Sequence, residues 1–107
     1  MDRVDEAMHA IERQEFLPPT QRERAALDVP LGIGHGATCS QPTTVATMLR
    51  LLGARTGHAV LDVGSGSGWT AALLDHLVTP GGTVVGVELE PALVTFARRN
   101  LTALHHP

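Results

Sequence analysis

The sequence lacks several features that would assign it to common classes of protein. Its 107 residues contain one cysteine, Cys39, so no disulfide forms within the chain, and no Cys/His spacing indicates a metal site. A reducing cytoplasm is therefore the expected compartment. No apolar run is long enough to span a membrane. The formal net charge is −3 and basic residues form no cluster, so neither nucleic acid nor a membrane is an expected partner.

The most informative stretch covers residues 59–74. An apolar run at Val60, Leu61 and Val63 predicts a short strand that is buried on both faces of a parallel sheet. A glycine-rich loop follows, and the pattern of residues 70–77 then predicts a helix. This order is typical of a nucleotide-type site, because glycines let the backbone approach a ligand and the start of a helix presents free N–H groups.

The spacing of Gly64, Gly66 and Gly68 indicates which ligand such a loop binds. The sequence has neither the G-x-G-x-x-G pattern of dinucleotide sites nor the Gly-Lys-Ser/Thr of a P-loop, which disfavours an NAD oxidoreductase and excludes a P-loop. Its G-x-G-x-G after Leu-Asp-Val is similar to the first motif of class I methyltransferases, which bind S-adenosylmethionine (AdoMet). Glu88 ends the next apolar run, residues 83–88, where an acidic residue accepts hydrogen bonds from ribose hydroxyls in an open α/β sheet.

The N-terminal part of the chain has the pattern of helices. Residues 2–15 predict an amphipathic helix with Asp2 as its N-cap, and the pair Pro18-Pro19 stops it. Thr20-x-x-Glu23 is a capping box that predicts a short second helix to about residue 27.

Residues 28–41 carry three glycines in five positions, which predicts a loop. Ser40 is the expected N-cap of the next helix, and Pro42 suits its first turn. The buried stripe of this helix is expected to consist of Val45, Met48, Leu49 and Leu52. After the glycine loop, a second strand at residues 83–87 and a helix from Pro91 are expected.

Four segments together resemble the protein-L-isoaspartate O-methyltransferase family, and the resemblance runs along essentially all 107 residues. They are Arg13-x-x-Phe16-x-Pro18, Asp28-x-Pro30-Leu31-x-Ile33-Gly34-x-Gly36-x-Thr38, Ser40-Gln41-Pro42 and the motif at residues 60–68. Members of this family transfer a methyl group from AdoMet to the free carboxylate of an isoaspartyl residue, which starts the repair of aged proteins. The resemblance therefore implies an enzyme with AdoMet as its cofactor and an isoaspartyl-containing protein or peptide as its partner.

The resemblance also implies roles for individual residues. The cofactor-binding residues that it carries over are Asp62, Gly64, Ser65, Gly66, Gly68 and Glu88. The substrate-binding residues are Gly36, Thr38, Cys39 and Ser40, and Ser40 is also the catalytic candidate. A hydroxyl and backbone N–H groups at the start of a helix suit the substrate carboxylate. No general base is required, because a carboxyl group with a pKa of ~3.5 is already ionised at neutral pH.

The expected fold is α/β, a truncated Rossmann-like class I methyltransferase fold in which N-terminal helices precede β-α-β-α with parallel strands. Residues 1–57 are expected to form an N-terminal helical and substrate-loop segment, and residues 58–107 the first half of the AdoMet-binding domain, together one structural unit. The chain resembles only about the N-terminal half of a family member, so we expect weak AdoMet binding and little or no turnover from the isolated chain. Self-association or a C-terminal half supplied elsewhere would complete the sheet.

Two other functions remain open from the sequence. One is a carboxyl methyltransferase of the same class that acts on a peptide natural product, and the other is a non-catalytic fragment that binds AdoMet or a protein partner. Among single residues, Trp69 either packs under the first helix or edges the cofactor. His35 is expected to be a solvated loop histidine, and Cys39 a packing residue, because no partner base is evident for it.

Overall fold

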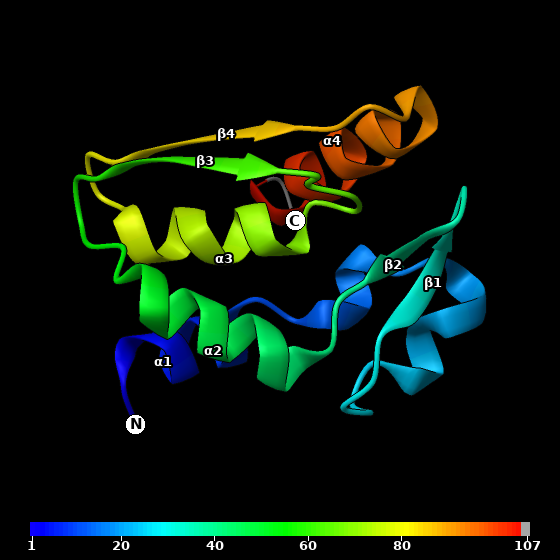
Figure 1. Ribbon diagram of the computed structural model, residues 1–107, viewed down its shortest axis with the longest axis horizontal. Helices are drawn as coiled ribbons and strands as arrows, with labels where there is room; N and C mark the ends of the chain where they lie inside the picture. The colour runs from blue at the N-terminus through cyan, green and yellow to red at the C-terminus, as the bar shows by residue number, and fades with distance from the viewer. Residues whose placement is uncertain (106–107) are drawn as a thin grey trace.

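The computed structural model describes residues 1–105, and its second half alternates strands and helices as the sequence predicted (Figure 1). In chain order the elements are α1 (Arg3–Ala10), the 3-10 helices η1 (Arg13–Phe16) and η2 (Pro19–Arg24), β1 (Leu31–Gly34), β2 (Ala37–Cys39), α2 (Pro42–Leu52), β3 (Ala59–Val63), α3 (Trp69–Val78), β4 (Thr83–Val87) and α4 (Pro91–His105). Within residues 1–105, no helix has the length and apolarity needed to cross a bilayer.

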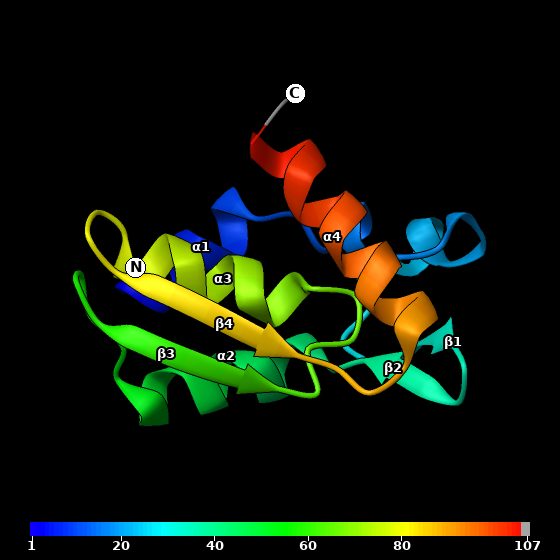
Figure 2. The same ribbon diagram turned by 90° about the horizontal axis from the view of Figure 1, so that it is seen from above.

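The strands β3 and β4 form a parallel two-stranded sheet, in which Ala59 lies opposite Thr83 and Val63 opposite Val87. Figures 1 and 2 show α1, α2 and α3 on one face of this sheet, with α4 beside α3. Because the strands are parallel, their carboxyl ends lie at the same edge, and the loops that follow them are brought together there. The predicted α/β architecture is confirmed.

The hydrophobic core lies between α3 and the N-terminal segment. Leu73 on α3 and Phe16 at the end of η1 are fully buried. Trp69, the first residue of α3, is 3% exposed, and its Nε1–H donates a 3.2 Å hydrogen bond to the carbonyl of Ile11. The sequence left open whether Trp69 packs under the first helix or borders the cofactor. In the structure it packs against the N-terminal segment, at the end of α1.

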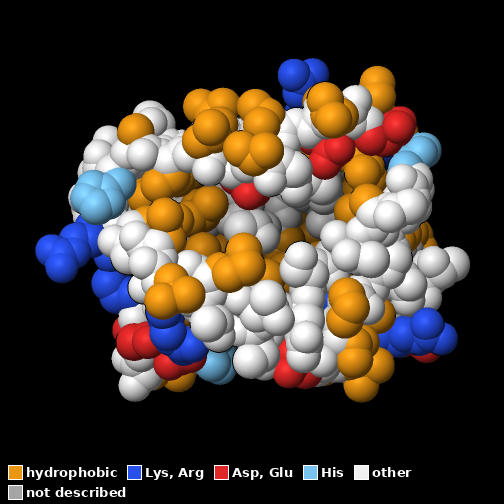
Figure 3. Space-filling model, in the orientation of Figure 1, with side chains coloured by type: hydrophobic (Ala, Val, Ile, Leu, Met, Phe, Trp, Pro, Cys, Tyr) orange, Lys and Arg blue, Asp and Glu red, His pale blue; other side chains and the backbone are white. Residues whose placement is uncertain are grey.

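The opposite face of the β3–β4 sheet is not covered by any element of residues 1–105 (Figure 2). Leu61 and Val63 on β3 are 62% and 74% exposed, and Val85 and Val87 on β4 are 57% and 43% exposed. Figure 3 shows hydrophobic side chains gathered at the top of the molecule, where these strands lie. The prediction of a strand buried on both faces is wrong, because the helices of the described chain cover one face only.

Helix α1 is shorter than the helix predicted at residues 2–15. Asp2 caps it through a capping box, as expected, but the helix ends at Ala10, where Ile11 takes an extended backbone conformation. Ile11 and Arg13 are both buried. Residues two apart in a continuous helix point in nearly opposite directions, so one helix could not bury both side chains against the same core.

The second predicted helix is the 3-10 helix η2, and the predicted capping box at Thr20 is wrong. The N-cap of η2 is Pro18, and no side chain caps it. Its backbone hydrogen bonds join residues three apart, such as the 2.9 Å bond from the N–H of Gln21 to the carbonyl of Pro18. Pro19, with its fixed φ, already begins the helix, so Thr20 lies within the first turn and cannot cap it.

Residues 28–41 contain a β-hairpin where a loop was predicted. β1 and β2 pair antiparallel with Leu31 opposite Cys39, and the register shifts near the tip. Leu31, Ile33 and Cys39 are buried, which fixes one face of the hairpin on the protein. At the tip, His35 has a φ of 57° between two glycines that also have positive φ, so the glycines form a tight turn.

Helix α2 begins without the predicted Ser40 cap. Its N-cap is Gln41, which makes no capping side-chain hydrogen bond. Asp28 performs this task from the preceding segment, because its Oδ1 accepts a 2.9 Å hydrogen bond from the N–H of Thr43 in the first turn. At the other end, Gly53 has the left-handed φ of 66° expected of a C-terminal glycine.

Only half of the predicted stripe on α2 is buried. Val45 and Leu49 are 2% and 4% exposed, as expected, whereas Met48 and Leu52 are 57% and 58% exposed. The prediction that Met48 and Leu52 belong to the core is therefore wrong. α2 packs on α1, and these two side chains lie outside the buried face of α2.

Candidate functional site

The loop between β3 and α3 has the backbone shape that its glycines predict. Gly64, Gly66 and Gly68 have φ values of 76°, 53° and 90°, which lie in the left-handed region that favours glycine. The N–H groups of Gly64 and Ser65 both donate to the carbonyl of Val87, at 2.8 and 3.0 Å. The loop is thus an open turn that is held against the end of β4.

Glu88 lies at the same edge of the sheet, directly after β4, and faces the glycine loop. Its Oε1 accepts a 2.9 Å hydrogen bond from the N–H of Gly66, and its Oε2 accepts a 3.0 Å bond from the N–H of Glu90. The bonds from the N–H groups of Glu90 and Gly66 hold the pKa of the Glu88 carboxyl below its usual value. An ionised carboxylate therefore borders the loop at neutral pH.

Asp62, on β3, carries a polar atom that the protein does not satisfy. Its Oδ2 is buried and has no hydrogen-bond partner within residues 1–105, and burial raises the pKa of this carboxyl. A buried acceptor without a partner is costly and uncommon in native structures. A perturbed carboxyl next to a glycine loop is a candidate for contact with a ligand.

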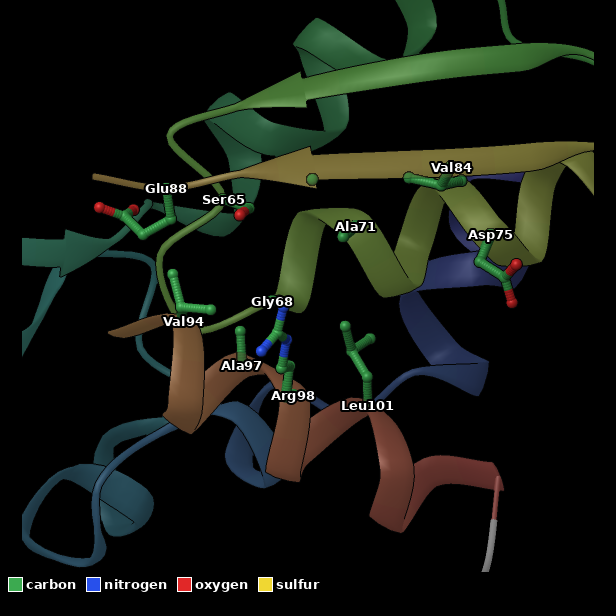
Figure 4. Close-up of a pocket in the computed structure, with 11 residues that line it drawn as sticks. Ser65, Gly68, Ala71, Asp75, Val84, Glu88, Val94, Ala97, Arg98 and Leu101 are labelled. Carbon is green, nitrogen blue, oxygen red and sulfur yellow. The ribbon is translucent and has the colours of Figure 1, made fainter. Parts of the chain in front are cut away.

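A cavity of about 260 Å³ opens between β4, α3 and α4. Figure 4 shows Ser65 and Glu88 at one end of it, with Arg98 extending from α4 toward the cavity. Its apolar walls consist of Ala71, Val84, Val94, Ala97 and Leu101. The cavity therefore connects the glycine loop to an apolar recess, the combination that small-molecule sites use.

The β1–β2 hairpin contacts this site from the other side. A Cβ placed on Gly66 would lie 3.3 Å from Cδ1 of Ile33, so the Ile33 side chain rests on the glycine loop. At the hairpin tip, Nδ1 of His35 lies 3.7 Å from Oε1 of Glu90. His35 is half exposed, as predicted for a loop histidine, but sequence reasoning missed its contact and that of Ile33, because both partners are more than 30 residues away in the chain.

The four predicted substrate residues lie along this hairpin and its exit. Gly36 lies in the tip turn, Thr38 is exposed on β2, and Cys39 is buried. Ser40 is exposed, its carbonyl accepts from Nη2 of Arg13 at 3.0 Å, and its hydroxyl has no hydrogen bond within the described chain. Their substrate roles, and the catalytic role of Ser40, stay predictions.

No metal site is evident in the part of the chain that the structure describes, where no three His, Cys, Asp or Glu side chains cluster suitably. The site described above consists of the glycine-rich loop, the carboxylates of Asp62 and Glu88, and the neighbouring hairpin. Carboxylate oxygens are acceptors for the hydroxyl and ammonium groups of a ligand.

Comparison with known proteins gives one consistent family. The family model described as protein-L-isoaspartate(D-aspartate) O-methyltransferase (PCMT) matches residues 1–107. A protein-L-isoaspartate O-methyltransferase of Methanopyrus kandleri is 52% identical over 100 residues, which are 94% of this chain and 44% of that protein. The same-named protein of Aeropyrum pernix is 54% identical over 99 residues, which are 92% of this chain and 38% of that protein. The chain thus spans less than half the length of these relatives.

Solved structures agree with this comparison. A protein-L-isoaspartate O-methyltransferase structure matches all of this chain and 35% of its own, with a TM-score of 0.87 and 31% identity. A crystal structure of a Plasmodium falciparum protein, assigned as a β-aspartate methyltransferase and in complex with S-adenosyl-L-homocysteine, matches 96% of this chain and 48% of its own, with a TM-score of 0.84 and 28% identity.

Proposed function

This chain belongs to the protein-L-isoaspartate(D-aspartate) O-methyltransferase family, and from that premise we propose that it takes part in AdoMet-dependent methylation of L-isoaspartyl carboxylates in proteins or peptides. The observation that carries the proposal is the pairing of the Gly64–Gly68 loop with Glu88 through the Gly66 N–H. That pairing puts the glycine loop and a ribose-type acceptor at one edge of a parallel sheet.

The residues at this edge fit AdoMet, which supplies the methyl group when bound. The unpaired Oδ2 of Asp62 offers an acceptor for the cationic methionine end. A Cβ at Gly64 would meet no atom within 4 Å, so open space lies beside the loop. Glu88, ionised at neutral pH, offers its oxygens to ribose hydroxyls. The apolar recess beyond Glu88 suits a flat base.

The protein has little acid–base chemistry to perform in this reaction. The acceptor carboxylate is ionised at neutral pH, so its oxygen is already a nucleophile. Rate then depends on holding that oxygen in line with the methyl group and on excluding water. In our proposal the hydroxyl of Ser40 and the N–H groups that begin α2 hold the carboxylate, and the hairpin residues Gly36 and Thr38 line its approach.

The described chain alone forms only part of a site for a ligand of this size. The two cavities beside the glycine loop hold about 260 and 360 Å³, at the low end of the range of about 300–1,000 Å³ that small-molecule sites commonly have. We therefore propose weak AdoMet binding and little or no turnover for the isolated chain, and full activity only when further chain covers this edge.

Titration with S-adenosyl-L-homocysteine, followed by NMR at millimolar ligand, tests the proposal on the chain as it exists. Gly64→Ala is the test variant and Gly57→Ala its matched control. Both glycines have positive φ (76° and 89°), open space where an alanine Cβ would lie, and an N–H bonded to a backbone carbonyl. Each substitution costs roughly 1–2 kcal/mol of backbone strain, so the two differ mainly in location.

We expect Gly64→Ala to weaken the affinity for S-adenosyl-L-homocysteine at least about tenfold, which corresponds to about 1.4 kcal/mol. We expect the affinity of Gly57→Ala to stay within about twofold of the parent, which corresponds to about 0.4 kcal/mol. Equal losses in both variants would mean that only stability matters. Shift changes confined to residues remote from Gly64, Asp62 and Glu88 would overturn the assignment of the site.

The uncovered sheet face supports a second candidate function, in which the chain binds a protein partner and transfers no methyl group. The face consists of Leu61, Val63, Val85 and Val87, all at least 43% exposed, and contiguous apolar surface of this kind is typical of interaction sites. Light scattering over a concentration series tests it. An oligomer that Val63→Asp disperses, together with no ligand binding, would favour this candidate over the first.

A further inference from the structure

Arg13 is a buried cation whose hydrogen bonds go to backbone carbonyls. The residue is 6% exposed, and its two terminal nitrogens donate five hydrogen bonds of 2.7–3.4 Å. The acceptors are the carbonyls of Ala25, Leu27, Val29, Cys39 and Ser40. A buried charge must be compensated, and here the compensation comes from carbonyl dipoles of two separate segments.

These acceptors lie on the two sides of the hairpin that borders the site. The first three belong to the segment that leads into β1, and the last two end β2 and precede α2. Nη2 alone joins both sides, at 2.7 Å from the carbonyl of Val29 and at 2.9 and 3.0 Å from those of Cys39 and Ser40. Arg13 therefore links the two ends of the hairpin at its base, and we call this set of five hydrogen bonds the clamp.

The same guanidinium also contacts the start of α3. Its central carbon lies 5.5 Å from the centre of the Trp69 ring, within the range of a cation–π interaction. Trp69 follows Gly68, the last glycine of the loop. One side chain thus touches both the segment that carries Ser40 and the helix that follows the glycine loop.

We propose that Arg13 is a positioning residue that holds Ser40 in place relative to the glycine loop, so that bound substrate and bound cofactor lie in the correct relative position. This inference rests on the proposed function, because it assigns the Ser40 segment to substrate and the glycine loop to AdoMet. Arg13 itself is buried and touches neither ligand. It acts through the carbonyls of Cys39 and Ser40 and through the ring of Trp69.

The geometry calls for arginine in particular. The two terminal nitrogens of a guanidinium present four N–H donors in one plane, and these bond the five carbonyls here, while Nε has no partner in the described chain. The guanidinium plane also stacks on an aromatic face, whereas an ammonium presents three donors around a point charge. Lysine at this position could serve some of the carbonyls, but it could not span both sides of the hairpin and also lie over Trp69. Arg13→Lys therefore keeps the charge and loses the clamp.

The single cysteine supplies a probe that does not depend on the proposed function. Cys39 is 5% exposed, and its carbonyl is one of those that Arg13 holds. The rate at which an aromatic disulfide reagent labels this thiol reports local opening of the Ser40 segment. Val78→Ala, a core truncation at the far end of α3, is the control for general destabilisation.

Urea is used to bring all variants to the same unfolding free energy. Under that condition we expect the reagent to label Cys39 at least about tenfold faster in Arg13→Lys and Arg13→Met than in Val78→Ala. A tenfold ratio corresponds to local opening that is easier by about 1.4 kcal/mol. If Arg13→Met does not fold, Arg13→Lys alone carries the comparison. Labelling rates that follow global stability on one line for all variants would overturn the proposal.

A second measurement tests the link between the two ligands. NMR titration with an isoaspartyl peptide, with and without saturating S-adenosyl-L-homocysteine, gives the factor by which one ligand tightens the other. We expect about fivefold or more for the parent chain and a factor near one for Arg13→Lys, a change that lost stability alone does not produce. An unchanged factor contradicts the proposal. If the parent binds neither ligand, the proposed function fails, while the thiol comparison still decides whether Arg13 fixes the segment.

Discussion

The backbone N–H of Gly66 donates a 2.9 Å hydrogen bond to Oε1 of Glu88, and this bond joins the loop after β3 to the loop after β4. The other oxygen of Glu88 accepts from the N–H of Glu90. The carboxylate is therefore oriented by two backbone donors before any ligand arrives. An oriented acceptor costs less to organise on binding than a free side chain does.

Glu88→Gln is expected to weaken binding of S-adenosyl-L-homocysteine by about tenfold. Glutamine keeps the shape, but its amide nitrogen cannot accept, so one of the two N–H groups loses its partner. The side chain is then neutral and no longer oriented by both donors, so it is a weaker acceptor for ribose hydroxyls. An NMR or calorimetric titration measures the change.

Glu90→Gln is the control for this variant, since it removes a neighbouring charge and leaves both donors to Glu88 in place. It removes the ion pair with half-exposed His35, and exposed pairs contribute little. Its amide oxygen can still accept the 3.3 Å hydrogen bond that the N–H of Ala92 donates to Oε1 of Glu90. Equal weakening by the two substitutions would show that net charge, and not the orientation of Glu88, governs binding.

Asp62→Asn is expected to stabilise the fold and weaken cofactor binding. Burial raises the folded-state pKa of Asp62, so the folded protein holds its proton more tightly than the unfolded chain does. Stability therefore falls as pH rises from the unfolded value of 3.8 through the folded pKa, and the cost is fully present above it. Asparagine removes this cost, so we expect a gain at neutral pH of up to about 1 kcal/mol, limited by partial exposure.

Urea denaturation over a pH series measures this effect. The difference between Asp62→Asn and the parent should disappear as pH falls below 3.8, because both side chains are then neutral. A variant that is less stable than the parent at neutral pH, and binds the cofactor analogue equally well, would contradict both parts of the prediction.

The glycine loop and the acid after β4 could be predicted from the sequence because their signals are local. Gly64, Gly66 and Gly68 adopt positive φ, which depends on each residue's own lack of a side chain. Glu88 follows a short apolar run, and parallel pairing then brings it to the same edge. The functional roles of these residues rest on the family and on the binding experiments proposed for them.

The hairpin and the clamp at its base could not be predicted in the same way, because their causes are distant contacts. Glycines in β1 hide the alternation of Leu31 and Ile33, which become a strand only when buried on the protein. Arg13 looks like any helix-surface arginine in the sequence. Its burial follows from carbonyls up to 27 residues away, which no local pattern encodes.

Acid is expected to remove a stabilising contribution from the N-terminus of α1. A hydrogen bond from Arg50, followed by one from the N–H of Asp5, lowers the pKa of Asp2 from 3.8 to about 2. A lowered folded-state pKa stabilises the fold above the unfolded value, and this contribution is lost as pH falls from about 5 to about 2. Asp2→Asn still caps a helix but cannot ionise, so its stability should be lower than that of the parent at pH 5 and approach that of the parent at pH 2.

Thermal or urea unfolding at these two pH values, at low salt, measures the difference. Added salt should shrink it at pH 5, because both partners are exposed and their attraction is screened. Parallel stability curves for the parent and Asp2→Asn across this range would contradict the assignment of the pKa shift to Asp2.

The start of α2 gives a prediction that separates capping from substrate binding. Asp28 accepts from the N–H of Thr43 at 2.9 Å and from its hydroxyl at 2.6 Å, whereas the hydroxyl of exposed Ser40 caps nothing in the described chain. Asp28→Ala should therefore lower the unfolding free energy, as the loss of an N-cap usually does. Ser40→Ala should change it by less than about 0.5 kcal/mol, as exposed surface positions do.

Substrate binding should show the opposite order if Ser40 meets the isoaspartyl carboxylate. In NMR titrations with an isoaspartyl peptide, Ser40→Ala should weaken binding several-fold, since about 1 kcal/mol for a lost hydrogen bond corresponds to roughly fivefold. Asp28→Ala should affect binding only as far as it unfolds the start of α2. The opposite result would be a Ser40→Ala chain that is clearly destabilised but has unchanged affinity for the peptide. It would assign Ser40 a capping role. The backbone N–H groups at the start of α2 would then be the remaining candidates for holding the carboxylate.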